Sequence, residues 1–145
     1  MTDFRHRMDL EVRFRDIDAL RHVNNASFFT YLEEARVHYF IDLLHAEAFE
    51  RLPLILAAAR IDFRAPILFG QVVDIGTRVD WIGTTSISMS HRMTASPDDR
   101  LVAEAGTILV CYDYDAAGPM PVPADWRSTF TEWENRDLQR PATNP

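Results

Sequence analysis

The chain contains no lysine, and all 15 of its basic residues are arginine. It has a single cysteine, Cys111, so neither an intramolecular disulfide nor a cluster of thiolate metal ligands is expected. The longest apolar run, residues 54–59, is far shorter than the roughly 20 residues that cross a bilayer, and the opening segment MTDFRHRMDLEV lacks the apolar core of a signal peptide. The net charge of −7 disfavours nucleic-acid binding, which requires a basic face. These absences predict a cytoplasmic protein without a nucleic-acid or membrane partner.

The chain does have enough apolar material for a folded core. Of its 145 residues, 47% are hydrophobic and 11% aromatic, which is typical of a globular protein and not of a disordered one. No internal repeat and no second domain is evident. We therefore expect a single domain over residues 1–145, with its core at about 8–134 and a tail over 135–145.

Hydrophobic periodicity predicts the order of the elements. Alternation at Met8, Leu10, Val12 and Phe14 predicts a first strand. A stripe of apolar residues at steps of three and four predicts a helix from Asn24 or Asn25 to about residue 44. Strands are then expected over 54–63, 72–81, 86–93 and 101–114, followed by a short helix over 123–134 that turns Trp126, Phe130 and Trp133 inward and by a frayed end. This order predicts an α+β fold in which one antiparallel sheet of about five strands wraps around a long central helix.

The segment between the first strand and the helix carries the polar residues suited to catalysis. Asp16 and Asp18 precede His22, and Asn24 and Asn25 stand where the helix begins. A carboxylate beside the positive end of a helix can attack a carbonyl or activate water, while the free N–H groups of the first turn bind the oxyanion. The segment therefore predicts acyl-transfer chemistry.

The stretch RFRDIDALRHVNNASFFTYLEEAR resembles the signature of the hotdog-fold acyl thioesterases. Its D-x-D, HVNN and aromatic-x-x-aromatic-x-E-x-A-R parts are those of the 4-hydroxybenzoyl-CoA thioesterase-like family and of related acyl-carrier-protein thioesterases, and weaker likenesses follow in IDFRAPILFGQVV, LVAEAGTILVCYD and MPVPADWR. Three positions depart from the pattern. Arg21 replaces the usual glycine, Gln71 replaces an acid, and Leu20 replaces an asparagine of the plant enzymes.

The resemblance implies a set of site residues. Asp18 would be the catalytic carboxylate, as nucleophile or general base, and the backbone N–H of Asn25 would be the oxyanion donor. His22 would orient Asp18, contact the thioester or water, or be structural, while Asp16 would shape the loop or pair with an arginine. Glu33 is expected to have a structural role beside Arg36. A separate expectation comes from charge: coenzyme A carries phosphates and the protein is negative, so arginines near the strand ends, Arg60, Arg64 and Arg92, are expected to bind substrate together with Asn24.

The implied activity is hydrolysis of an acyl-CoA or acyl-carrier-protein thioester to a free acid and a thiol, in fatty acid metabolism. No metal and no cofactor is expected, since coenzyme A is part of the substrate, and a homodimer or tetramer is expected. One alternative is a hotdog enoyl-CoA hydratase or dehydratase, which Leu20 disfavours because that branch uses D-x-N-x-x-H. The other is a non-catalytic acyl-CoA-binding protein. The acyl group and the choice between coenzyme A and a carrier protein stay open.

Overall fold

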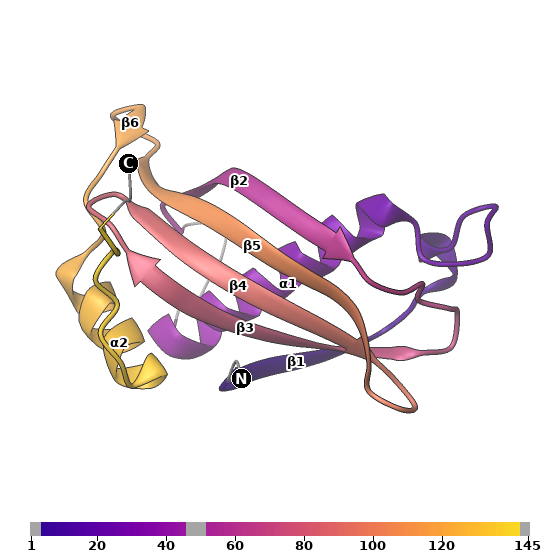
Figure 1. Cartoon of the computed structure of the whole chain (residues 1–145). Helices are drawn as coiled ribbons and strands as arrows, with labels where there is room; N and C mark the ends of the chain where they lie inside the picture. Colours follow the sequence, from indigo (N-terminus) through magenta and orange to yellow (C-terminus); the bar gives the residue numbers. More distant parts are fainter. Residues whose placement is uncertain (1–3, 46–51, 143–145) are drawn as a thin grey trace. The chain divides into compact units, whose positions relative to one another are not determined.

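The computed structural model describes residues 4–45 and 52–142. Its sheet has the strand order β1-β3-β4-β5-β2, and the short strand β6 pairs with β5 (Figure 1). The strands are β1 (His6–Glu11), β2 (Leu54–Phe63), β3 (Val72–Ile82), β4 (Ser86–Ala95), β5 (Arg100–Asp113) and β6 (Gly118–Pro119). The helices are η1 (Phe14–Asp16, a 3-10 turn), α1 (Asn25–Leu44) and α2 (Ala124–Glu134). The predicted α+β fold, with a long helix packed against an antiparallel sheet, is confirmed.

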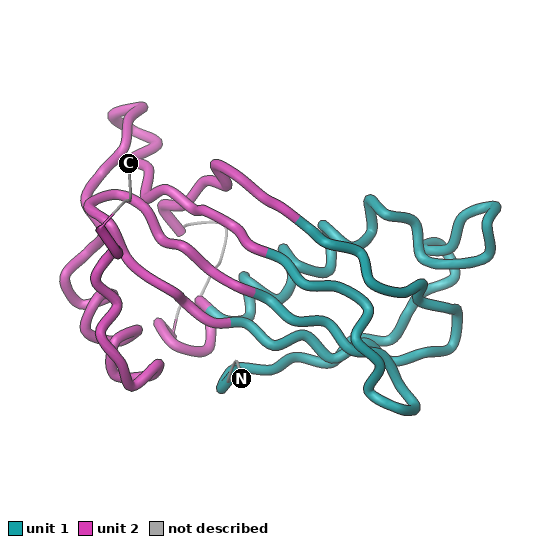
Figure 2. Tube along the Cα trace, viewed as in Figure 1, with its two compact units in different colours: residues 1–39, 61–77, 91–105 teal, residues 40–60, 78–90, 106–145 magenta. Residues whose placement is uncertain are grey.

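The chain divides into two compact units that share its long elements (Figure 2). Unit 1 comprises residues 1–39, 61–77 and 91–105, and unit 2 comprises residues 40–60, 78–90 and 106–145. α1 and the strands β2 to β5 each contribute to both units. The expectation of one domain over 1–145 stays a prediction.

Unit 1 buries the first half of α1 against strands. Phe28, Leu32 and Ala35 of the predicted stripe belong to one core cluster with Val73, Ile75 and other strand residues. β1 pairs with β3 in a register that sets Met8 opposite Ile75 and Leu10 opposite Val73. Burial of each large apolar side chain contributes roughly 1.5–3 kcal/mol. This core holds the start of α1 in place.

The first strand is shorter than its sequence pattern suggests. Alternation predicted strand residues as far as Phe14, but β1 ends at Glu11 and Phe14 begins the turn η1. Val12 is still buried, and its N–H bonds to the carbonyl of Gln71, 3.2 Å away. Phe14 is 81% exposed and meets the ring of Phe69 edge-on. The prediction for Phe14 was wrong because the chain turns into η1 directly after Val12.

Unit 2 is organised around α2 and the residues that follow it. Phe130 of α2 is fully buried and packs edge-on against Phe40, whereas Trp126 and Trp133 are half-buried. The sequence predicted a frayed end after α2, but the residues that directly follow the helix are anchored. Leu138 is 3% exposed, and its carbonyl accepts the N–H of Ile82 at 2.7 Å.

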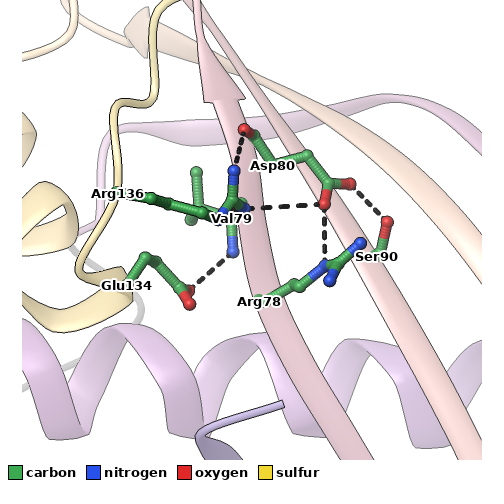
Figure 3. A network of polar contacts seen from close by, with 6 residues as sticks. All are labelled: Arg78, Val79, Asp80, Ser90, Glu134 and Arg136. Atoms are coloured by element: carbon green, nitrogen blue, oxygen red, sulfur yellow. Dashed lines mark hydrogen bonds and ion pairs between the residues drawn. The ribbon is translucent and has the colours of Figure 1, made fainter. Parts of the chain in front are cut away.

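Side chains at the end of α2 bond the backbone of β3 (Figure 3). The N–H of Val79 donates to the buried carboxylate of Glu134 at 2.9 Å, and the guanidinium of Arg136 donates to the carbonyls of Val79 and Asp80. β1 pairs with β3 only over Val72–Thr77, so the rest of this β3 edge lacks a partner strand within the described residues. Two side chains and the carbonyl of Leu138 therefore take the place of a neighbouring strand, which protects an exposed edge.

Candidate active site

The loop between β1 and α1 is closed by backbone hydrogen bonds. Ile17 and Val23 form an antiparallel bridge. Inside it, the N–H of Asp18 donates to the carbonyl of His22 at 3.2 Å, and the N–H of Arg21 donates to the carbonyl of Asp18 at 3.0 Å. Arg21 has a φ of 67°, in the left-handed region that favours glycine. The turn therefore has the backbone that the family's glycine would adopt without strain.

The Asp18 carboxylate is held through both of its oxygens. Oδ1 accepts the backbone N–H of Leu20 at 2.9 Å, and Oδ2 accepts the side-chain amide of Asn24 at 3.1 Å. The side chain is half-buried. A carboxylate oxygen has about two lone-pair positions, so each oxygen keeps one for a further partner. Asp18 is thus oriented and still able to accept a proton or attack a carbonyl carbon.

The start of α1 is capped and yet keeps one donor available. Asn24 is the N-cap, because its Oδ1 accepts the N–H of Ala26 at 2.8 Å and its carbonyl accepts the N–H of Ser27 at 2.9 Å. No residue within 4–45 or 52–142 accepts the N–H of Asn25. This N–H lies at the positive end of the helix dipole, where an oxyanion would be stabilised.

Asp16 shapes the loop, one of its two predicted roles. Its Oδ2 accepts the hydroxyl of Tyr31 at 2.6 Å and the backbone N–H of Arg13 at 3.1 Å. Burial, together with the bond to Asp16, raises the pKa of Tyr31 well above its ordinary value. The two aspartates therefore differ: Asp16 ties the loop to the body of α1, and Asp18 keeps open acceptor positions.

A cavity of about 330 Å³ lies beside the helix start. Phe28 and Phe63 meet edge-on in its wall, with ring centroids 5.0 Å apart. Arg64 also lines it and forms an ion pair with Glu104 at 3.1 Å. The lining residues are His22, Val23, Asn25, Phe28, Phe63, Arg64, Ala65 and Pro66. The cavity thus joins the predicted oxyanion donor to an aromatic wall and one guanidinium.

The predicted site residues fall into three groups. His22, Asn25 and Arg64 meet at the cavity, and Asp18 and Asn24 are bonded to each other in the adjoining loop. Arg60 and Arg92 do not line this cavity. The imidazole of His22 is not among the groups that bond the carboxylate of Asp18 in the described chain. Nothing in the sequence favours the six-residue spacing from Asp18 to Asn24 over the four-residue spacing to His22.

Neighbouring polar groups have structural roles. Burial lowers the pKa of Arg36, and the charge of Glu33 on the same helix opposes this shift, in line with the structural role expected for Glu33. Gln71 stands where the family has an acid: its amide donates to the carbonyl of Ser96 at 2.6 Å and accepts the N–H of Leu68 at 2.8 Å. An ionised carboxylate could make only the second of these bonds.

The described residues offer neither a reactive cysteine nor a cluster of metal ligands. Burial raises the pKa of the Cys111 thiol to about 11, so it is protonated at neutral pH and a poor nucleophile. Residues 4–45 and 52–142 contain no group of three or more His, Cys, Asp or Glu side chains that could hold a metal ion.

Over the same residues, no helix is long and apolar enough to cross a membrane.

The fold and the loop define a class of protein: a hotdog-fold enzyme that presents a carboxylate beside an open helix N-terminus. A family model described as the thioesterase-like superfamily matches residues 12–132. The chain belongs to this superfamily.

Individual relatives are similar over most of their length. A thioesterase from Thermus thermophilus, solved in complex with coenzyme A and Zn, is 34% identical, with 95% of this chain and 100% of that chain covered and a TM-score of 0.85. The long-chain acyl-CoA thioesterase FadM of Escherichia coli K12 is 27% identical over 85% of this chain and 95% of its own. The chloroplastic acyl-acyl carrier protein thioesterase ATL3 of Arabidopsis thaliana is 25% identical over 94% of this chain and 73% of its own.

Proposed function

We propose that this protein is an acyl-CoA thioesterase in which Asp18 is the catalytic carboxylate and the N–H of Asn25 binds the oxyanion. The observation that carries the proposal is the pairing in one loop of an oriented carboxylate with a helix start whose first N–H has no acceptor in the described chain. The superfamily and the named thioesterases agree with it.

The residues at hand suffice for hydrolysis. In the general-base route, Asp18 takes a proton from water while the water oxygen adds to the thioester carbon. The developing oxyanion accepts the N–H of Asn25, and such a donor typically contributes about 10²–10³ in rate. Collapse of the tetrahedral intermediate breaks the C–S bond, and the departing thiolate takes up the proton held by Asp18. In the nucleophilic route, Asp18 first forms an acyl anhydride, which water then cleaves to the same products. Neither route calls for a metal or a redox cofactor.

Arg64 is the best-supported of the predicted phosphate partners. It lines the cavity, whereas Arg60 and Arg92 do not, and its guanidinium is half-exposed beside Glu104. Loss of a contact to the nucleotide should raise KM with little change in kcat. We therefore expect Arg64→Ala to raise KM for acyl-CoA and to leave KM for the corresponding acyl-pantetheine unchanged. Unchanged KM for acyl-CoA would favour a carrier protein as the donor, as in the relative from Arabidopsis.

A homodimer or tetramer remains part of the proposal. β2 ends the sheet order and exposes apolar side chains, with Ile55 at 40% and Leu56 at 43%. An apolar edge strand of this kind normally acquires a cover. Sedimentation should give a mass of at least twice 16.7 kDa, and an active monomer would contradict this part of the proposal. A cytoplasmic location also remains a prediction.

The central test is Asp18→Asn, assayed with acyl-CoAs of several chain lengths and with aromatic acyl-CoAs. Release of free thiol is the readout, because a hydratase or a binding protein would release none. We expect kcat to fall by on the order of 10²–10⁴-fold, with an unchanged melting temperature. Asp98→Asn, in an exposed turn, is the matched control and should keep full activity. A kcat for Asp18→Asn within a few-fold of the parent would refute the assignment.

A further inference from the structure

Asn24 joins the catalytic loop to the start of α1 through both ends of one side-chain amide. Nδ2 donates to the Oδ2 of Asp18 at 3.1 Å, and Oδ1 accepts the N–H of Ala26 at 2.8 Å. Its backbone N–H donates to the carbonyl of Asp16 at 2.8 Å. We infer that Asn24 is a positioning residue that fixes the plane of the Asp18 carboxylate relative to the helix N-terminus, an inference that rests on the proposed function.

The two bonds of the amide require an asparagine. One end must donate, because it meets a carboxylate, and the other must accept, because it meets a backbone N–H. Aspartate at this position could cap the helix but could not donate to Asp18. Serine could cap the helix too, but it has a single short hydroxyl in place of the two-ended amide. The cap can therefore be separated from the contact to Asp18 by substitution.

The second bond to Asp18 is the one that controls its orientation. The bond from Leu20 to Oδ1 spans only two residues and by itself leaves the carboxylate free to turn about that contact. The bond from Asn24 to Oδ2 removes this freedom. It fixes the orientation of the carboxylate relative to the helix that carries the N–H of Asn25. Correct orientation of reacting groups can contribute several kcal/mol to catalysis, and small misplacements cost up to about 10²-fold.

The histidine of the motif does not hold this position. His22 lines the cavity, and the bonds to the Asp18 carboxylate come from Leu20 and Asn24. His22 reaches Asp18 through its backbone carbonyl, which accepts the N–H of Asp18. The role of orienting Asp18, one of those predicted for His22, is thus assigned to Asn24.

The experiment compares Asn24→Ser and Asn24→Asp in the full chain. Both keep a helix cap and lose the amide Nδ2 that donates to Asp18, so kcat should fall about 10-fold or more while KM changes less than about 3-fold. Asn24→Asp also sets a second negative charge against Asp18, so the acid limb of the kcat/KM profile should move to higher pH. The other titratable groups of the loop, Asp16 and His22, are unaltered. Thr30→Gly, at an exposed position of the same helix, is the control for loss of helix stability.

A double-mutant cycle then tests whether Asn24 acts through Asp18. In an Asp18→Asn background, Asn24→Ser should cause no further loss of the residual rate. An equal loss in both backgrounds would overturn the inference, as would a loss that Thr30→Gly reproduces. Parental kcat and pH profile in both Asn24 variants would also overturn it. The proposed function would survive that last result if Asp18→Asn alone abolished turnover, and it would fail independently if Asp18→Asn stayed active.

Discussion

The start of α1 and the second half of the β3 edge meet the same physical problem in opposite ways. In both places, backbone polar groups lack the partners that a continued helix or a neighbouring strand would supply. At β3 the gap is closed: Glu134 and Arg136 bond the backbone of Val79 and Asp80 (Figure 3). The carbonyl of Leu138 accepts the N–H of Ile82. At α1 the closure is incomplete, and the N–H of Asn25 has no acceptor among the described residues.

The difference indicates where function resides. A buried unpaired donor costs about 1–3 kcal/mol, but Asn25 is exposed, so water can serve it until an oxyanion arrives. At β3 the N–H of Val79 is bound by Glu134, which is only 8% exposed, so water cannot readily take the place of this acceptor. Substitutions at the first place should therefore change rate, and substitutions at the second should change stability.

The largest effect on stability should follow from Glu134→Ala. The substitution leaves the N–H of Val79 without its 2.9 Å carboxylate acceptor in a buried position. We expect the free energy of unfolding to fall by about 2–3 kcal/mol, which corresponds to roughly 5–10 °C in melting temperature. kcat per folded molecule should not change.

Two controls separate this bond from other effects on α2. Glu134→Gln keeps an acceptor oxygen and should lose less than half as much stability, while Glu132→Ala, at an exposed position of the same helix, should be nearly neutral. If all three variants have the same melting temperature, the bond from Val79 to Glu134 is not what stabilises unit 2.

A slightly smaller effect on stability is expected at a buried hydrogen-bonded pair in unit 1, His91 and Thr77. The Nδ1 of His91 lies 3.2 Å from the hydroxyl of Thr77. Burial, with a contribution from the charge of Arg36, lowers the pKa of His91 to about 3. The unfolded chain takes up a proton near pH 6.5 and the folded chain does not, so this stability is complete above pH 6.5 and is lost as the pH falls toward 3.

The pH dependence of unfolding measures this contribution. Between pH 7 and pH 5, His91 should account for a loss on the order of 2 kcal/mol. His91→Gln cannot titrate, so its stability should fall correspondingly less over the same interval, whatever its stability at pH 7. Parallel curves for the two proteins would show that His91 becomes protonated in the folded state.

Patterns within single elements were predictable from the sequence. The bounds of β2 were predicted to the residue, and those of β3, β4 and β5 to within two residues. Along much of β3, β4 and β5 more and less buried side chains alternate, whereas β2 is exposed over residues 55–60 and its bounds follow from Pro53 and Pro66 on either side. The exception is Phe14, which continues the alternation although the chain has already turned. Nothing in residues 134–138 indicates their bonds to β3, since Glu134 and Arg136 bond backbone groups that have no sequence signature of their own.

The same limit applies to the candidate site. The D-x-D and HVNN residues indicate a carboxylate at the start of a helix. Asn24 or Asn25 was expected as the cap, and the structure shows that it is Asn24. Sequence spacing could not decide whether His22 or Asn24 bonds Asp18, because the answer depends on how the turn at Arg21 directs the two side chains. The cavity residues Phe63 and Arg64 lie far along the chain from that turn, and only the folded structure brings them together with it.

The smallest expected effect compares the left-handed residues of the two regions. Arg21, in the catalytic loop, has a φ of 67°, and Asn135, after α2, has a φ of 55°. Asn135 is the C-cap of α2, and its N–H bonds to the carbonyl of Thr131 at 2.9 Å. Asparagine tolerates this conformation better than most residues, whereas arginine bears the steric cost of its Cβ. Arg21 in the catalytic loop is therefore expected to bear more backbone strain than Asn135 at the end of α2.

Arg21→Gly should therefore raise the free energy of unfolding by about 0.5 kcal/mol, since relief of roughly 1–2 kcal/mol of strain is partly offset by the greater freedom of glycine in the unfolded chain. Asn135→Gly should be close to neutral, because less strain is relieved there. Arg21→Ala removes the same charge but keeps the Cβ, so it should show no gain.

Chemical denaturation of the three variants measures these differences directly. A gain in Arg21→Ala equal to that in Arg21→Gly would attribute the effect to loss of the guanidinium and not to the backbone. If only the glycine variant is stabilised and kcat is unchanged, the strain at Arg21 reflects a missing glycine, whereas a stabilised variant with reduced kcat would show that the strained turn helps to present Asp18.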